Sequence, residues 1–232
     1  MKKTLLLLLP LMLTLGACTD KKQETKPSNS DSGDVTPDWG ETSTKTIVFK
    51  GAKNRSGLTS GSQLNEGNFN NVLTNYINEQ ADDSLTALGG KKCTMQLVGG
   101  DSGSDTSLTI GTGSANGLIY FTFNLDIVKI DVTIQNYYKP HHDYEQNIDV
   151  SGIDQNAEVT ICSYVAPATE DGEGTIKESQ KVNLSTTDTV NVPSERDASF
   201  ALKEATNTIA FKNDEEKHRT YIHSLTVTYL VK

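Results

Sequence analysis

The chain has 232 residues and a formal net charge of −9, from 21 basic and 30 acidic side chains. This acidic balance argues against binding to the phosphate backbone of a nucleic acid, which depends on clustered Lys and Arg, and it suits a well-solvated surface. The length that remains beyond residue 45 fits a single domain with a hydrophobic core of its own.

Residues 1–17 have the parts of a removable secretory signal. Lys2 and Lys3 precede an apolar run, and small residues follow it. The run is about half as long as the roughly 20 residues that a bilayer-spanning helix needs, and Pro10 would break a helix inside it. We therefore expect this segment to be cleaved off rather than to span the membrane.

The signal ends in Leu15-Gly16-Ala17-Cys18. This sequence resembles the lipobox of bacterial lipoproteins, which implies cleavage before Cys18 and attachment of a lipid to its sulfur. The alternative is an ordinary signal with an incidental cysteine, but this cysteine falls where the apolar run stops. Two or three acyl chains on one residue suffice for stable attachment to a membrane.

Residues 18–45 predict a disordered tether, because they are polar and contain almost no apolar residue before Val35. A flexible chain of this length has an r.m.s. reach of roughly 30 Å. The tether resembles the spacers of lipoproteins on the extracellular face of Gram-positive cell membranes, although a Gram-negative envelope stays open. The folded domain is then expected over residues 46–232.

One helix is predicted near residues 66–80. Its apolar stripe has the spacing i, i+3, i+4, i+7 and i+8 and consists of Phe69, Val72, Leu73, Tyr76 and Ile77. We expect this helix to close one end or edge of a sheet rather than to bind a partner.

Almost everything else alternates apolar and polar residues with a period of two, which is typical of half-buried strands. Turn clusters rich in Gly, Asp and Asn separate these runs. The pattern predicts an all-β fold with one or two short helices, in the form of an antiparallel, jelly-roll-like β-sandwich. The alternating runs lie in residues 119–123, 128–134, 159–165, 198–202, 209–211 and 221–231.

The order of strands and turns in residues 108–121, 127–134, 207–211 and 219–227 resembles the galactose-binding-like jelly-roll modules of secreted bacterial proteins. The resemblance covers roughly residues 105–232 and consists of strands and turns, not of catalytic residues. It implies a binding module. Residues 46–104 are not obviously covered and could complete the same sandwich.

The richest cluster of functional side chains lies after the predicted strand 128–134. Aromatic rings beside Asp and His could stack on sugar rings and bond their hydroxyls, which predicts a ligand-binding loop. The alternative is a solvated loop whose tyrosines shield the end of the core. Adjacent histidines in a strand or turn point in opposite directions, so we expect no metal here. The residues are Tyr137, Tyr138, His141, His142, Asp143 and Tyr144.

Three further motifs have structural interpretations. Cys93 and Cys162 could form a disulfide in an exported protein, but Cys162 alternates with apolar neighbours, so two buried thiols are the alternative. The glycines at 111, 113 and 117 have the wrong spacing for a nucleotide-binding loop and predict a turn between strands. His223 shares parity with an apolar face, which predicts a half-buried, hydrogen-bonded histidine.

No set of nucleophile, base and orienting residue is recognisable, so we expect no enzyme. No cofactor is predicted either. A structural calcium ion at Asp101 and Asp105 is conceivable, but the segment lacks the spacing of a calcium-binding loop.

The sequence therefore predicts a membrane-tethered extracellular lipoprotein whose β-sandwich binds glycans. The alternative is a structural or adhesive envelope protein that binds a protein partner, and a hydrolase fits least well. A sugar binder should have a concave face or a loop with exposed aromatic rings, whereas a protein binder should have a flatter apolar patch.

The lipid anchor is directly testable. Cells that express the chain and are fed radioactive palmitate should label it, and Cys18→Ser should abolish the label because no sulfur remains to accept the lipid. Equal labelling of the two forms would refute lipidation at Cys18.

Overall fold

The structure is a computed structural model in which all strand pairings between described residues are antiparallel. The predicted fold class, an all-β antiparallel sandwich, is confirmed. The described residues are 37–50, 63–64, 73–80, 84–89, 95–98, 107–111, 117–138, 153, 155–169, 174–188, 191–213 and 219–232. The strands are β1 (Thr42–Val48), β2 (Gln63–Leu64), β3 (Ala87–Gly89), β4 (Met95–Val98), β5 (Ser107–Ile110), β6 (Leu118–Asn136), β7 (Glu158–Val165), β8 (Thr175–Asn183), β9 (Glu195–Lys212) and β10 (Thr220–Leu230).

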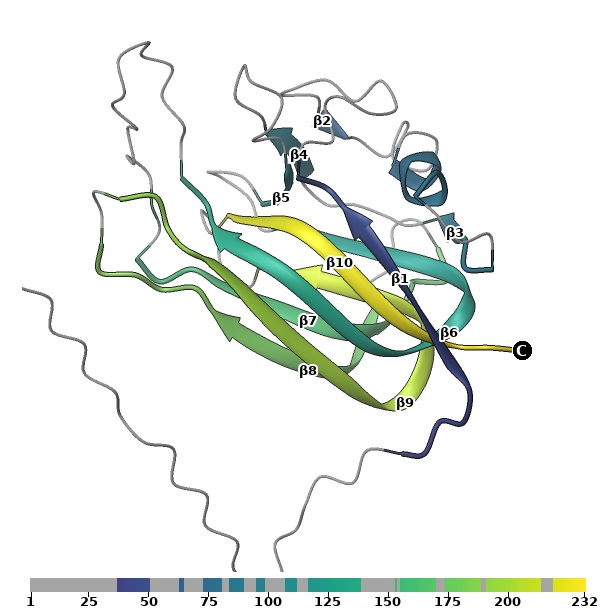
Figure 1. The fold of residues 1–232 in the computed structure, drawn as a ribbon. Coiled ribbons are helices and arrows are strands. Elements are labelled where there is room, and N and C mark those ends of the chain that lie inside the picture. Colours follow the sequence, from purple (N-terminus) through teal and green to yellow (C-terminus); the bar gives the residue numbers. More distant parts are fainter. Residues whose placement is uncertain are drawn as a thin grey trace, which may run out of the picture. The chain divides into compact units, whose positions relative to one another are not determined.

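Two long strands, β6 and β9, pair with each other near both of their ends and connect the two layers (Figure 1). Their register shifts between Thr122 and Lys129, and such bulges bend strands. The front layer consists of β1, β10, residues 127–136 of β6 and residues 195–206 of β9. The back layer consists of residues 118–122 of β6, residues 208–212 of β9, β7 and β8.

The core lies between these layers, because the strands turn one set of alternate residues inward. Val132 of the front layer and Phe121 and Phe211 of the back layer belong to one buried apolar cluster. The rings of Phe121 and Phe211 meet edge to face, with centroids 6.5 Å apart. Burial of this apolar surface is the main favourable contribution to the stability of such a domain.

The tether is shorter than predicted. We expected it to continue to residue 45, but β1 begins at Thr42 and pairs with β10 along its whole length. The alternation in β1 is hard to recognise in the sequence, because its first inward residue with a long side chain is Lys45, which is buried and donates to the Leu85 carbonyl at 3.0 Å. The other domain boundaries stay predictions.

Residues 73–78 are helical, inside the predicted span 66–80, whereas residues 65–72 and 81–83 lie outside the described part of the chain. Leu73, Tyr76 and Ile77 of the predicted stripe are buried. The Tyr76 hydroxyl donates to the Val48 carbonyl, and the Gln80 side chain accepts the Val48 N–H at 2.8 Å. This segment therefore covers the end of the β1 edge, as expected. Among the described residues no helix is long and apolar enough to cross a bilayer.

The glycine-rich motif lies between β5 and β6, as a turn between strands should, although residues 112–116 are outside the described part. Gly111 has a φ of 81°, a backbone conformation that favours glycine. A Cβ atom on Gly117 would lie only 2.2 Å from the backbone nitrogen of Gly111 and 2.3 Å from Cγ2 of Ile110. The two ends of the turn can approach so closely only because Gly117 has no side chain.

Gly117→Ala should therefore destabilise the domain by about 1–3 kcal/mol, the usual range for overpacking a filled site. Urea denaturation measures this change in the free energy of unfolding. Gly40→Asn is the control, because Gly40 has nothing within 4 Å of its added Cβ and Asn tolerates a positive φ. Equal stabilities of the two variants would contradict the proposed close contact.

Candidate functional site

The outer side of the front layer carries short polar side chains in aligned rows. Thr46 of β1 lies opposite Thr226 of β10, which lies opposite Asp131 of β6, which lies opposite Ser199 of β9. The next row continues through Ser224, Thr133 and Asp197. Because side chains alternate along a strand, these residues point away from the core that their neighbours form. We call the following set the polar face: Thr46, Asp131, Thr133, Asp197, Ser199, Ser224 and Thr226.

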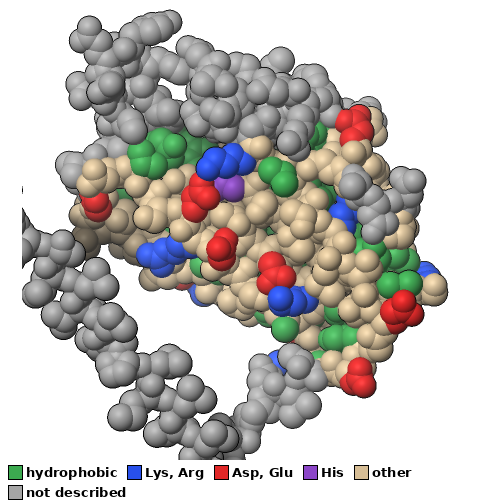
Figure 2. Space-filling view, in the orientation of Figure 1, with side chains coloured by type: hydrophobic (Ala, Val, Ile, Leu, Met, Phe, Trp, Pro, Cys, Tyr) green, Lys and Arg blue, Asp and Glu red, His purple; other side chains and the backbone are tan. Residues whose placement is uncertain are grey.

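A shallow hollow of about 200 Å³ lies on the polar face, over β6, β9 and β10. Figure 2 views this side of the molecule, where charged side chains of both signs are scattered over a surface with few hydrophobic groups. The lining residues are Asp131, Val132, Thr133, Asp197, Ala198, Ser199, Ser224 and Thr226.

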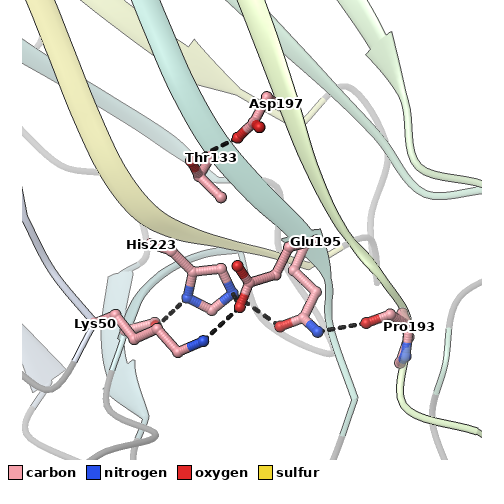
Figure 3. Close-up of polar contacts among 8 residues, drawn as sticks. Lys50, Thr133, Pro193, Glu195, Asp197 and His223 are labelled. Carbon is pink, nitrogen blue, oxygen red and sulfur yellow. Dashed lines mark hydrogen bonds and ion pairs between the residues drawn. The ribbon is translucent and has the colours of Figure 1, made fainter. Parts of the chain in front are cut away.

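Several of the polar side chains are held in place by one another. The Thr133 hydroxyl donates to a carboxylate oxygen of Asp197 at 2.7 Å (Figure 3). Lys129 forms an ion pair with Asp131 at 2.9 Å, and the hydroxyl oxygens of Thr46 and Thr226 lie 2.8 Å apart. The hollow therefore presents oriented hydroxyl and carboxylate oxygens on rigid strands.

A buried histidine lies at one end of the polar face. The pairing of β10 with β6 shifts by one residue between Ile222 and Ser224, so His223 sits in a bulge. Its side chain is 7% exposed, with Nδ1 2.6 Å from the Ser107 hydroxyl and Nε2 2.8 Å from the Gln135 carbonyl oxygen. The side-chain amide of Gln135 donates an N–H to the Pro193 carbonyl, which assigns its other terminal atom as the oxygen. This oxygen can only accept a hydrogen bond from His223. Nε2 of His223 is therefore protonated and donates to this oxygen.

Charged groups surround this histidine on its exposed side. A Glu195 carboxylate oxygen lies 2.5 Å from the Lys50 ammonium and 3.8 Å from Nε2 of His223 (Figure 3). The hydrogen bond from Lys50 lowers the pKa of Glu195. Burial lowers the pKa of His223, although the charge of Glu195 acts in the opposite direction. The predicted hydrogen bonding of His223 is confirmed, but the residue is buried rather than half-buried, and its partners Ser107 and Gln135 were not predictable from spacing.

Ser107, His223 and Glu195 superficially resemble a nucleophile, a base and an acid. However, Ser107 is fully buried and the Nε2 proton of His223 is committed to Gln135. A substrate carbonyl could not reach the serine oxygen without opening this part of the sheet. The arrangement joins β5, β6, β9 and β10 and is structural in this conformation.

Only two of the predicted ligand-binding residues lie in the described part. Tyr137 is 7% exposed, because its ring stacks on Tyr221 at 5.2 Å and the Arg219 guanidinium lies 3.6 Å above it. The carbonyl of Tyr138 accepts the Tyr221 hydroxyl at 2.8 Å. These contacts match the alternative in which the tyrosines shield the end of the core. A ligand-binding role for Tyr137 and Tyr138 stays a prediction, as it does for His141, His142, Asp143 and Tyr144, which lie outside the described residues.

Other predicted sites also lie outside the described part, namely Cys18, Cys93, Asp101 and Asp105. Cys162 is buried and its thiol donates to the Ala210 carbonyl at 3.5 Å, but a disulfide with Cys93 stays untested. The described ranges contain no group of three or more His, Cys, Asp or Glu side chains that could hold a metal ion.

The outer side of the back layer has a different character. The rings of Tyr120 and Tyr164 lie side by side with centroids 5.2 Å apart, and Tyr164 pairs with Ile176, which is 39% exposed. Beneath the rings, Cys162 and Ala210 are fully buried. We call Leu118, Tyr120, Tyr164 and Ile176 the apolar patch.

No family model and no curated protein sequence matches the chain. Solved structures that resemble it include carbohydrate-binding modules and parts of glycan-degrading enzymes, among them a rhamnosidase from Klebsiella oxytoca. A family 29 carbohydrate-binding module has 13% identity and a TM-score of 0.36, over 81% of this chain and 92% of that one. The C-terminal family 22 module of Clostridium thermocellum Xyn10B has 11% identity and a TM-score of 0.30, over 66% of this chain and 88% of that one. Because both TM-scores lie below 0.5, we argue the function from this chain's own residues.

The lowered pKa of His223 predicts how stability depends on pH. Its pKa in the folded protein lies below the ordinary value of about 6.5, so the unfolded chain binds this proton first as the pH falls. The stability from neutral His223 is present above that value and is lost as the pH falls through the folded pKa. Glu195 acts in the same direction at lower pH, because its pKa is also lowered.

The free energy of unfolding, measured with denaturant, should therefore decrease from pH 7.5 to pH 5.5, and it should decrease less in His223→Gln. Lys181→Gln, which alters an exposed ion pair with Glu158, is the control and should retain the native pH dependence. An unchanged pH dependence in His223→Gln would show that this histidine is not the titrating group.

Proposed function

We propose that the chain is a non-catalytic binding module that is held outside the membrane by a lipid on Cys18 and binds a glycan on the polar face. The observation that supports this proposal best is the hollow over β6, β9 and β10, which is lined by Ser, Thr and Asp side chains. Sugar hydroxyls both donate and accept hydrogen bonds. Carboxylates accept them, and Ser and Thr hydroxyls do either, so the lining complements a polyhydroxylated ligand.

The position of these groups on strands favours binding without rearrangement. Each lining side chain has a fixed neighbour in the sheet register, and the short Ser, Thr and Asp side chains lose little rotamer entropy when a ligand binds. Ser199 and Ser224 make no side-chain hydrogen bond to the described residues, so their hydroxyls can bond a ligand without breaking an existing contact.

The buried His223 arrangement supports binding rather than hydrolysis, because the only serine that it contacts among the described residues is closed to solvent. The predicted lipid and tether support a location outside the cell, since a flexible segment with a reach of roughly 30 Å would hold the polar face clear of the headgroups.

A second function is favoured by a different observation. The accessible part of the apolar patch, which consists of Leu118, Tyr120 and Ile176 beside the buried ring of Tyr164, is the kind of surface that binds a protein. An envelope protein with an adhesive or structural role would use this side rather than the polar face.

A glycan array with the soluble chain that begins after Cys18 tests the proposal. We expect retention of a defined set of glycans, and a double variant Thr133→Val/Ser199→Ala should weaken binding at least about tenfold, because two or more hydrogen bonds are lost. Tyr120→Ala, on the opposite side of the domain, is the matched control and should bind as the native chain does.

If the native chain binds no glycan on the array, glycan binding is refuted, and a protein partner at the apolar patch becomes the favoured function. Loss of glycan binding in Tyr120→Ala, with full binding in the double variant, would place the glycan site on the back layer instead.

A further inference from the structure

We infer that the hollow on the polar face selects a sugar that carries a protonated amine, that is, an amino sugar with a free ammonium group. This inference rests on the proposed glycan-binding function and adds the chemical class of the ligand. The inference follows from which carboxylates on this side of the sheet form an ion pair with a lysine and which does not.

Three carboxylates lie on the outer side of the front layer near the hollow, and they differ in their partners. Glu195 pairs with Lys50, and Asp131 pairs with Lys129. Asp197 accepts a hydrogen bond from the Thr133 hydroxyl and takes part in no ion pair with the described residues. Its charge lies near that of Glu195, whose pKa is lowered overall by the Lys50 hydrogen bond although the charge of Asp197 opposes this. The hollow therefore contains one negative charge that no cation among the described residues neutralises.

The second carboxylate of the hollow, Asp131, lies on the neighbouring strand. Asp131 is opposite Ser199, which is two residues from Asp197, so the two carboxylates are diagonal neighbours across β6 and β9. Such neighbours have Cα atoms roughly 7–8 Å apart, with Cβ atoms somewhat closer. Thr133 contacts Oδ1 of Asp197 and Lys129 contacts Oδ1 of Asp131, which leaves the Oδ2 atom of each for a ligand.

An ammonium group matches this arrangement in number and in kind. It has three donors and no acceptor, and the hollow offers it two carboxylate oxygens, together with the Ser199 hydroxyl, which lies opposite Asp131 in the same row. Acetylation of the amine removes the charge and two of its three donors. A sugar acid would place a carboxylate beside Asp197, where like charges repel.

The attraction should depend on salt, because the site is open to solvent and Debye screening at 0.15 M ionic strength already acts over about 8 Å. The contribution of hydroxyl contacts to binding should not depend on salt in this way. The two contributions can therefore be separated in one titration series.

Isothermal calorimetry with the soluble native chain, at a pH where the amine is charged, tests the inference. The probes are a glucosamine oligomer, its fully N-acetylated counterpart and a uronate oligomer of equal length. We expect the glucosamine oligomer to bind at least about fivefold more tightly than the acetylated one, as a charge-assisted hydrogen bond exceeds a neutral one, and the uronate to bind most weakly. Raising the salt should remove most of the preference.

Asp197→Asn should abolish the preference while it keeps the oxygen that accepts from Thr133. Asp126→Asn is the control, because it makes the same charge change at an exposed position of β6 that does not line the hollow. It should retain the full preference.

Equal binding of the amine and acetylated oligomers, tighter binding of the uronate, or an undiminished preference in Asp197→Asn would overturn the inference and leave glycan binding intact. Tighter binding of a lysine peptide of the same charge would also overturn it, in favour of a protein ligand. If none of the oligomers binds and the array also shows no bound glycan, the proposed glycan-binding function itself is overturned.

Discussion

The pairing of β6 with β9 is the interaction on which the rest of the domain depends. These strands exchange hydrogen bonds in the front layer and again in the back layer, and their register shifts at the bend between the two. The pairing fixes which residues face the core. A slip of one residue on β6 would bury Asp131 and expose Ile130 and Val132, at a large cost in free energy. The same register that closes the core therefore builds the polar face.

The sequence was sufficient to predict the fold class and the faces of the strands whose two sides differ. Residues 128–134 and 221–231 alternate clearly because one side of each is buried. β8 has no such signal, since its residues are all exposed or half-buried, and the start of β1 was missed for a similar reason. The alternation of apolar and polar residues reports only which residues of one strand share a side. It contains no information about which strand lies beside which, so the rows of the polar face could not be predicted.

His223 illustrates the same limit within one residue. Its parity with apolar neighbours predicted a half-buried side chain, whereas the residue is buried, and its partners Ser107 and Gln135 are 116 and 88 residues away in the chain. The bulge that positions the ring has no glycine or proline to mark it in the sequence. Glu195 connects this buried arrangement with the hollow, because it lies two residues from Asp197 on the same side of β9. The groups that set the pH dependence of stability and those of the proposed binding site are therefore close neighbours on β9. The polar face and the apolar patch offer different kinds of surface.

We propose that a ligand binds on the polar face of the front layer. Backbone amide chemical shifts, recorded during titration with a glycan that the array retains, test it most directly. The account predicts that the largest changes occur at Asp131, Thr133, Asp197, Ser199 and Thr226. Changes centred on Tyr120, Tyr164 and Ile176, or on residues 139–150, with an unperturbed polar face, would contradict it.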